Sequence, residues 1–393
     1  MLVAAHRPRP GSHKGPRHLR LGVGCLGVSR STCDANGQMM RRRPSTTRAV
    51  ATGLVALLAG WGTTLAVGPS DTSGVASIVR PVIIDTDMGQ DDLMALAWLL
   101  RDPSLEILAV TVAGTGLAHC APGVDNLRAV IELMDAAGPE VGCGPEISLG
   151  GGTPFPDDWR AFTDQLGGVS LPAAPDAGTP SRPAAEIIGD QLRRRTELVT
   201  ILTLGPFTTL ATTLTADPGS VADIAEVVAM GGALDVPGNV IPEGASTLGG
   251  SEWNLHVDPV AAAMVLESGV PLTFVALDAT KDAPMTAQIA ASLAADHTAT
   301  GAWLANELIQ HDPFIVSGEW FLWDALAAAA LIDPTLVTTV DERLSVTVSG
   351  LDAGRLVRDD AGHDARVATT ADSARFTDAF LAGLRIPPVA PGP

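Results

Sequence analysis

Four carboxylates lie within eight residues, directly after a short aliphatic run at residues 82–84. They belong to Asp85, Asp87, Asp91 and Asp92. Carboxylates this close together repel one another and lose solvation on burial, so a positive charge must compensate them. A hard divalent cation with oxygen ligands suits such a group. The pattern therefore predicts a metal site in the loop between a buried strand and a helix over residues 93–100.

The elements that must position this loop alternate between strand-like and helix-like segments with short connections. Further strands are predicted at residues 105–113, 199–205, 225–231, 271–277 and 345–349, with a weak one at 140–144. Helices are predicted at residues 123–137, 184–195, 207–215, 260–268, 287–310, 321–332 and 372–384. This alternation predicts an α/β fold, an open, mostly parallel sheet with helices on both faces. We expect one large domain over residues 80–388.

Residues 148–183 are rich in Gly, Pro and Asp and show no apolar periodicity. We interpret them as a long loop. Loops of this length in compact domains are usually functional lids or disordered segments.

Parallel strands deliver their carboxyl ends to one edge of the sheet, so residues after different strands can converge there. The residues that could join the acidic loop at this edge are Thr208, through its backbone carbonyl, Asn239, Glu252, Asn254 and Asp324. Asp324 lies among apolar neighbours, and a buried carboxylate there requires a partner that a metal would supply. Asp258 before a proline is interpreted as a helix cap, and His256 as a packed or surface histidine.

Composition restricts the possible partners. The chain has 393 residues, 46% of them apolar, which is enough to bury a sizeable core. Residues 1–48 hold ten of the 25 basic residues but only one of the 44 acidic ones, so the remainder carries a net charge of −28. An anionic surface of this kind argues against nucleic acid or an anionic membrane as partner.

The N-terminal region divides into two parts. Residues 1–38 have no apolar periodicity, and we interpret them as disordered or as an over-extended gene start. Residues 39–76 place arginines before an apolar segment at 49–67 and a polar exit, which is typical of a secretory signal. We expect export, with a single membrane anchor as the alternative, because about 19 apolar residues suffice to span a bilayer.

Two cysteines, Cys120 and Cys143, lie after this leader region. In an exported protein they could pair, and no metal-binding spacing is present. Two separate, buried cysteines are at least as plausible an interpretation.

The acidic loop resembles the N-terminal signature of the inosine-uridine type nucleoside hydrolases. The resemblance rests on Asp85-Thr-Asp-Met-Gly-Gln-Asp-Asp92 and extends over roughly residues 80–385. The other segments that match in the family's order are Thr111–Gly114, Leu204–Thr208, Met230–Gly232 with Gly238-Asn239, and Glu252–Asn254 with Asp258-Pro259.

The resemblance implies an enzyme that hydrolyses the N-glycosidic bond of ribonucleosides, with Ca²⁺ at the sheet edge. The implied calcium ligands are Asp87, Asp92, the Thr208 backbone oxygen and Asp324, with Asp87 also the general base. The implied ribose-binding residues are Asp91, Asn239, Glu252 and Asn254. Asp85 is implied to hold the site residues in place without contacting the substrate. It also implies a homo-oligomer, a dimer or a tetramer.

The chain departs from the family pattern at Trp323, where better-known members have a histidine that is associated with protonating the leaving base. We expect the base to be activated by stacking on Trp323, Trp253 or Trp159, with a slight preference for purines. Thr115 and Thr209 each replace a usual asparagine.

Two other classes of protein are alternatives to a nucleoside hydrolase. A haloacid-dehalogenase phosphatase also begins with Asp-x-Asp after a strand, but it needs Thr or Val where this chain has Gly89. It also needs a later lysine, and Lys281 is the only lysine beyond the leader. A secreted nucleoside-binding or degenerate hydrolase-like protein without turnover remains the non-enzyme alternative, because of Trp323.

Overall fold

The computed structural model describes residues 79–242, 244 and 246–387. They all belong to one compact unit. The expectations for residues 1–38 and 39–76 lie outside the described residues. No helix in the described part is long and apolar enough to cross a membrane.

A ten-stranded sheet forms the centre of this unit, in the order β4-β3-β2-β1-β5-β6-β7-β10-β8-β9. The seven strands from β4 to β7 are parallel, and β10 also runs parallel to β7. The strands are β1 (Arg80–Thr86), β2 (Leu105–Val112), β3 (Glu140–Cys143), β4 (Arg182–Pro183), β5 (Val199–Thr203), β6 (Ile224–Met230), β7 (Leu272–Val275), β8 (Val337–Val346), β9 (Leu356–Arg358) and β10 (His363–Ala371). The predicted fold class is confirmed.

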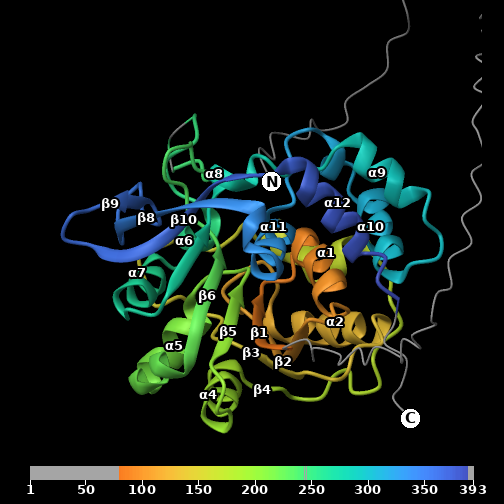
Figure 1. Ribbon diagram of the computed structural model, residues 1–393, viewed down its shortest axis with the longest axis horizontal. Coiled ribbons are helices and arrows are strands. Elements are labelled where there is room, and N and C mark those ends of the chain that lie inside the picture. The colour runs from red at the N-terminus through yellow and green to blue at the C-terminus, as the bar shows by residue number, and fades with distance from the viewer. Residues whose placement is uncertain (1–78, 243, 245, 388–393) are drawn as a thin grey trace, which may run out of the picture. The chain divides into compact units, whose positions relative to one another are not determined.

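Helices cover both faces of the sheet (Figure 1). On one face lie α1 (Gln90–Leu99), α2 (Cys120–Leu133) and α11 (Trp323–Ile332). Outside them pack α9 (Ala287–Ala294), α10 (Thr300–His311) and α12 (Ser373–Gly383). The other face packs against α4 (Ala184–Arg194), α5 (Thr208–Ala216) and α7 (Pro259–Glu267). Because β1 is buried on both faces, its residues 82–84 form a continuous apolar run in the sequence.

The remaining helical turns lie in the connections. They are α3 (Asp157–Thr163), α6 (Trp253–Val257), α8 (Leu277–Thr280), η1 (Leu166–Gly168), η2 (Pro218–Asp223), η3 (Pro313–Val316) and η4 (Pro334–Leu336). The segment 148–183, predicted as a loop, therefore contains α3, η1 and the short strand β4.

Strand β1 lies where the strand order reverses, between β2 and β5. In open α/β sheets this is the place where a crevice forms beyond the carboxyl ends of the strands. The register pairs Asp85 with Thr111 on one side and with Thr203 on the other. The acidic loop therefore emerges between the ends of β2 and β5.

Two predicted elements differ from the observed ones. The helix predicted over 287–310 is broken into α9 and α10, because the Asp296 carboxylate accepts hydrogen bonds from the Thr298 and Ala299 amides at 3.0 and 3.1 Å. A side chain that bonds to the local backbone in this way competes with the helix. The late strand predicted at 345–349 is the end of the longer β8, which joins β9 and β10 in an antiparallel extension.

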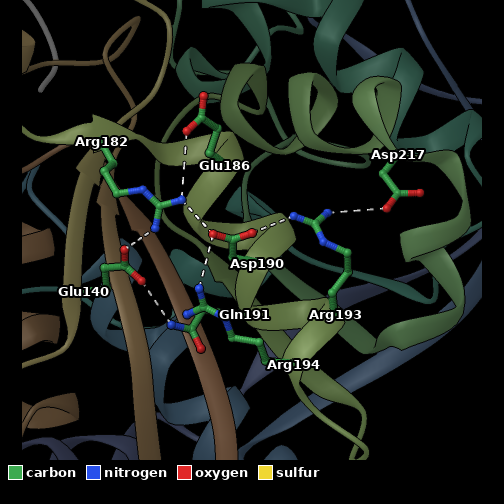
Figure 2. A network of polar contacts seen from close by, with 8 residues as sticks. All are labelled: Glu140, Arg182, Glu186, Asp190, Gln191, Arg193, Arg194 and Asp217. Atoms are coloured by element: carbon green, nitrogen blue, oxygen red, sulfur yellow. Dashed lines mark hydrogen bonds and ion pairs between the residues drawn. The ribbon is translucent and has the colours of Figure 1, made fainter.

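A disulfide between Cys120 and Cys143 joins the start of α2 to the end of β3. At the same edge of the sheet, Arg182 of β4 forms ion pairs with Glu140 at 2.5 Å and with Asp190 of α4 at 2.7 Å (Figure 2). The network is exposed, so each pair contributes little stability. It connects the two-residue strand β4 to β3 and α4.

Candidate active site

The loop between β1 and α1 is folded around the carboxylate of Asp92. The backbone amides of Asp87 and Gly89 donate to Asp92 at 3.1 and 3.0 Å, and the Thr86 hydroxyl donates to it as well. Met88 adopts a left-handed conformation with φ 68°, which turns the chain sharply enough for these contacts. Asp92 is 1% exposed, so the first turn of α1 holds a buried carboxylate in one orientation.

Asp324, at the start of α11, brings a third carboxylate to this place. Asp91, Asp92 and Asp324 each offer an oxygen, and these oxygens lie within 4.8 Å of one another. Asp324 is 2% exposed, and its Oδ1 has no hydrogen-bond partner among the described residues. Burial, followed by the charge of Asp91, raises the pKa of Asp324 well above its ordinary value. A divalent cation would satisfy the unpartnered oxygen and neutralise the cluster.

Asp87 faces the same cavity from the other side of the loop. It is 3% exposed, and its Oδ2 accepts a hydrogen bond of 3.3 Å from the Leu117 amide. A Cβ added at Gly116 would lie 2.2 Å from the Cβ of Asp87, and one at Gly205 would lie 2.8 Å from it. Glycine at both positions leaves room for the Asp87 side chain. Burial, with the charge of Asp92 next, raises its pKa well above the ordinary value.

The role of Thr208 as a backbone ligand stays a prediction. Its hydroxyl donates to Asp258 at 2.7 Å, and its carbonyl oxygen accepts from the Thr212 hydroxyl within α5 at 2.7 Å. Thr208 does not line the cavity that holds Asp87, Asp92 and Asp324, whereas Leu204 does. Leu204 follows the last residue of β5, and its carbonyl oxygen accepts a hydrogen bond from the Asn254 side-chain amide at 2.8 Å.

Three other predicted residues line the cavity and are tied to one another. Glu252 caps α6, accepting from the Asn254 amide at 3.0 Å and from the Gly232 amide at 3.0 Å. The Asn254 side-chain amide donates to the Leu204 carbonyl at 2.8 Å, and the Asn239 side chain accepts from the Trp253 amide at 3.0 Å. Burial raises the pKa of Glu252. These contacts fix three polar side chains on the wall opposite the acidic loop.

Aromatic side chains close the cavity. Trp253 stacks on Phe155 with ring centres 4.9 Å apart, and Trp159 meets its edge at 5.4 Å. Trp320 and Trp323, at the start of α11, form a second pair at 5.4 Å. Both aromatic groups line the cavity together with the carboxylates of Asp87, Asp91, Asp92 and Asp324. The cavity therefore combines a carboxylate floor with flat apolar walls.

The comparisons with known proteins decide the family. The family model described as inosine-uridine preferring nucleoside hydrolase matches residues 82–378. The chain belongs to this family. A pyrimidine-specific ribonucleoside hydrolase, RihA of Salmonella agona (strain SL483), is 30% identical over 285 residues, covering 69% of this chain and 85% of the relative.

Solved structures agree with this assignment. An inosine-uridine preferring nucleoside hydrolase from Bacillus anthracis matches with a TM-score of 0.66 and 26% identity, covering 78% of this chain and 100% of that one. A purine-preferring ribonucleoside hydrolase from Gardnerella vaginalis matches with a TM-score of 0.67 and 27% identity, covering 78% and 98%. This nucleoside hydrolase family member is a hydrolase that acts on ribonucleoside N-glycosyl bonds.

Two residues of the nucleoside hydrolase signature act outside the cavity. Asp85 is 1% exposed and accepts a 2.6 Å hydrogen bond from the Thr111 hydroxyl, and burial raises its pKa to about 7. Asp258 caps α7 through the Ala261 amide at 3.1 Å, as predicted. It also accepts from the Leu149 amide at 2.7 Å, in addition to Thr208. Asp258 thus connects α5 and α7 to the segment that leads to Phe155. His256 is buried, and its Nδ1 forms a hydrogen bond with the Ala353 carbonyl oxygen.

Several residues of the cavity wall were not predicted from the sequence. They are Gln90, Leu117, Phe155, Leu204, Met230 and Trp320. An aromatic residue within a segment rich in Gly, Pro and Asp was the one available signal for Phe155. The others are apolar or neutral residues, and no local pattern distinguishes them from core.

Proposed function

We propose that this protein hydrolyses ribonucleosides to free base and ribose in a reaction that depends on calcium. The observation that carries the proposal is the convergence of Asp91, Asp92 and Asp324 beside Asp87 on the floor of an aromatic cavity.

The donor set fits a calcium ion. The candidate ligands are Asp87, Asp92 and Asp324, which line the cavity, and the Thr208 backbone oxygen, which the family resemblance implies. Hard oxygen ligands of this kind are those that Ca²⁺ prefers. The unpartnered Oδ1 of Asp324 supports the fit. When bound, the cation would lower the pKa of a water molecule and attract the ribose hydroxyls.

In the proposed reaction Asp87 takes a proton from the attacking water. Asp91, Asn239, Glu252 and Asn254 hold the ribose hydroxyls. As the glycosidic bond breaks, positive charge develops on the sugar. Carboxylates under the ring stabilise that charge without having to reorganise.

The leaving base is activated without an imidazole, because no histidine lines the cavity in the described part of the chain. Trp323, Trp253 and Trp159 provide flat faces on which a base stacks, and stacking would favour its protonation by solvent. We propose that the enzyme slightly prefers purine nucleosides as substrates. The names of the relatives include both a pyrimidine-specific and a purine-preferring enzyme, so they favour neither base class.

Export and self-association are further proposals. The Cys120–Cys143 disulfide supports export, because disulfides persist in oxidising compartments. A homo-oligomer, a dimer or a tetramer, is proposed from the family resemblance alone.

A panel assay tests the proposed function. The purified protein with calcium is offered ribonucleosides with all common bases, and release of free base and reducing sugar is measured. Base release from at least one nucleoside is expected. If no nucleoside is cleaved although nucleosides bind, the protein is a binding protein, and release of phosphate from nucleotides alone would favour a phosphatase.

A further inference from the structure

Gln90 is a buried polar residue of the cavity that the proposed reaction does not use. It is the first residue of α1, it is 4% exposed, and it lines the cavity beside Asp91. A buried amide in a substrate cavity costs free energy unless both its nitrogen and its oxygen find partners. A ligand can therefore bond only to the atom of the Gln90 amide that has no partner in the protein.

Asp312 determines which atom of the Gln90 amide has a protein partner. The Gln90 Nε2 donates to Asp312 Oδ2 at 3.1 Å, and Asp312 Oδ1 accepts from the Phe314 amide at 3.0 Å as the cap of η3. A carboxylate accepts but does not donate, so only the nitrogen of the Gln90 amide can face it. The cap contact holds Asp312 in place, and Asp312 in turn fixes which way the amide points.

The oxygen of the amide is consequently directed away from Asp312. No donor among the described residues contacts Gln90 Oε1, and this oxygen is not among their buried atoms that lack a partner, so it retains accessible surface. Packing limits rotation of the side chain. Gly167 of η1 lies against Gln90, such that a Cβ at position 167 would be 3.2 Å from Gln90 Cγ.

We propose that Gln90, oriented by Asp312, is a specificity-determining residue that accepts a hydrogen bond from a neutral donor on the substrate. The inference rests on the proposed function, since the substrate is taken to be a nucleoside. Besides the 2′- and 3′-hydroxyls, adenosine offers two such donors, the exocyclic amino group of the base and the 5′-hydroxyl of the sugar.

The test compares three nucleosides in the presence of calcium. Adenosine carries both donors, purine riboside lacks the amino group, and 5′-deoxyadenosine lacks the 5′-hydroxyl. Affinity is measured from the quenching of tryptophan fluorescence immediately after mixing, before the nucleoside is hydrolysed. The variants are Gln90→Leu and Asp312→Ser, since serine still caps η3 but removes the carboxylate from Gln90. Gln165→Leu is the matched control, because Gln165 is an exposed glutamine bonded to the Ala161 carbonyl.

Gln90→Leu is expected to weaken adenosine binding by about 2- to 10-fold, the net value of one hydrogen bond. The analogue that lacks the relevant donor should bind Gln90→Leu and the wild type equally well, which identifies the donor. Asp312→Ser should show the same pattern to a smaller extent, and it carries the test if Gln90→Leu does not fold. Equal effects on all three nucleosides, no effect, or no binding of any of them by the wild type would overturn the proposal. Binding that follows the expected pattern without base release would refute the proposed function and leave the role of Gln90 intact.

Discussion

Replacing Asp258 by alanine is expected to destabilise the protein and to loosen its aromatic wall. The carboxylate accepts from the Thr208 hydroxyl and the Leu149 amide at 2.7 Å, from the Ala261 amide at 3.1 Å and from the Gly150 amide at 3.3 Å. Loss of the helix cap costs about 1 kcal/mol. The two closest donors, Thr208 and Leu149, each lose a charge-assisted acceptor, which we set at about 1 kcal/mol because Thr208 can turn to Thr115 and Leu149 to water. The free energy of unfolding should therefore fall by about 3 kcal/mol.

Asp372 provides a matched control. It caps α12 through a hydrogen bond of 3.1 Å from the Arg375 amide, and no other element of the described part donates to it. Asp372→Ala should therefore cost only the cap, about 1 kcal/mol. Both variants are compared with the wild type by urea unfolding at equilibrium.

The Asp258 variant should also bind substrate less well, because the segment it anchors at Leu149 leads to Phe155 and Trp159. We expect KM for a good nucleoside substrate to rise by about 2- to 10-fold, the value of one aromatic pair. The Asp372 variant should keep the wild-type KM. If the two variants lose the same stability and keep the same KM, Asp258 is only a helix cap.

The remaining predictions concern pH and the leaving base. Burial raises the pKa values of Asp85 and Asp91 to about 7 from 3.8, so the metal-free fold keeps protons that the unfolded chain releases above pH 4. Its melting temperature should therefore fall as pH rises from about 4 to 7, whereas the gain on adding calcium should grow over the same range because ligands must be ionised. A flat profile in thermal melts would contradict these pKa shifts. Trp323→Ala should lower kcat for purine nucleosides by about tenfold, whereas Trp303→Ala, at an exposed position of α10, should not change it. Equal kcat values for the two variants would show that stacking on Trp323 does not activate the leaving base.

Local sequence was sufficient to predict the part of the site that is local. Asp87, Asp91 and Asp92 share one loop, and an aliphatic strand before it and a helix after it indicate its place at the sheet edge. Asp324 was predictable although it lies far from the acidic loop in the sequence, because a buried carboxylate among apolar neighbours requires a partner.

The backbone ligand could be predicted only from the family resemblance, because a backbone carbonyl has no sequence signature. Leu204, just after β5, lines the cavity, and its apolar side chain gave no sign of this in the sequence. Gln90 escaped prediction for a related reason. Its partner Asp312 is 222 residues away, so no local pattern connects the two.

The fold was predicted where apolar periodicity is strong, as in the parallel strands and most helices. It was missed in β9 and β10, whose surface-facing charges at Arg358, Asp364 and Arg366 obscure the strand pattern. The pairing of β10 with both β7 and β8 compensates for this weak local preference.

The central claim is that the carboxylate cluster holds a calcium ion on which nucleoside hydrolysis depends. The direct measurement is a calcium titration of the chelator-treated protein, following the initial rate of base release. We expect almost no rate without metal, and a rise to full rate as one ion binds per chain. In Asp324→Asn the midpoint should shift to at least tenfold higher calcium, because a charged ligand is lost. A full rate in the chelator-treated protein, or an unchanged midpoint in Asp324→Asn, would contradict the account.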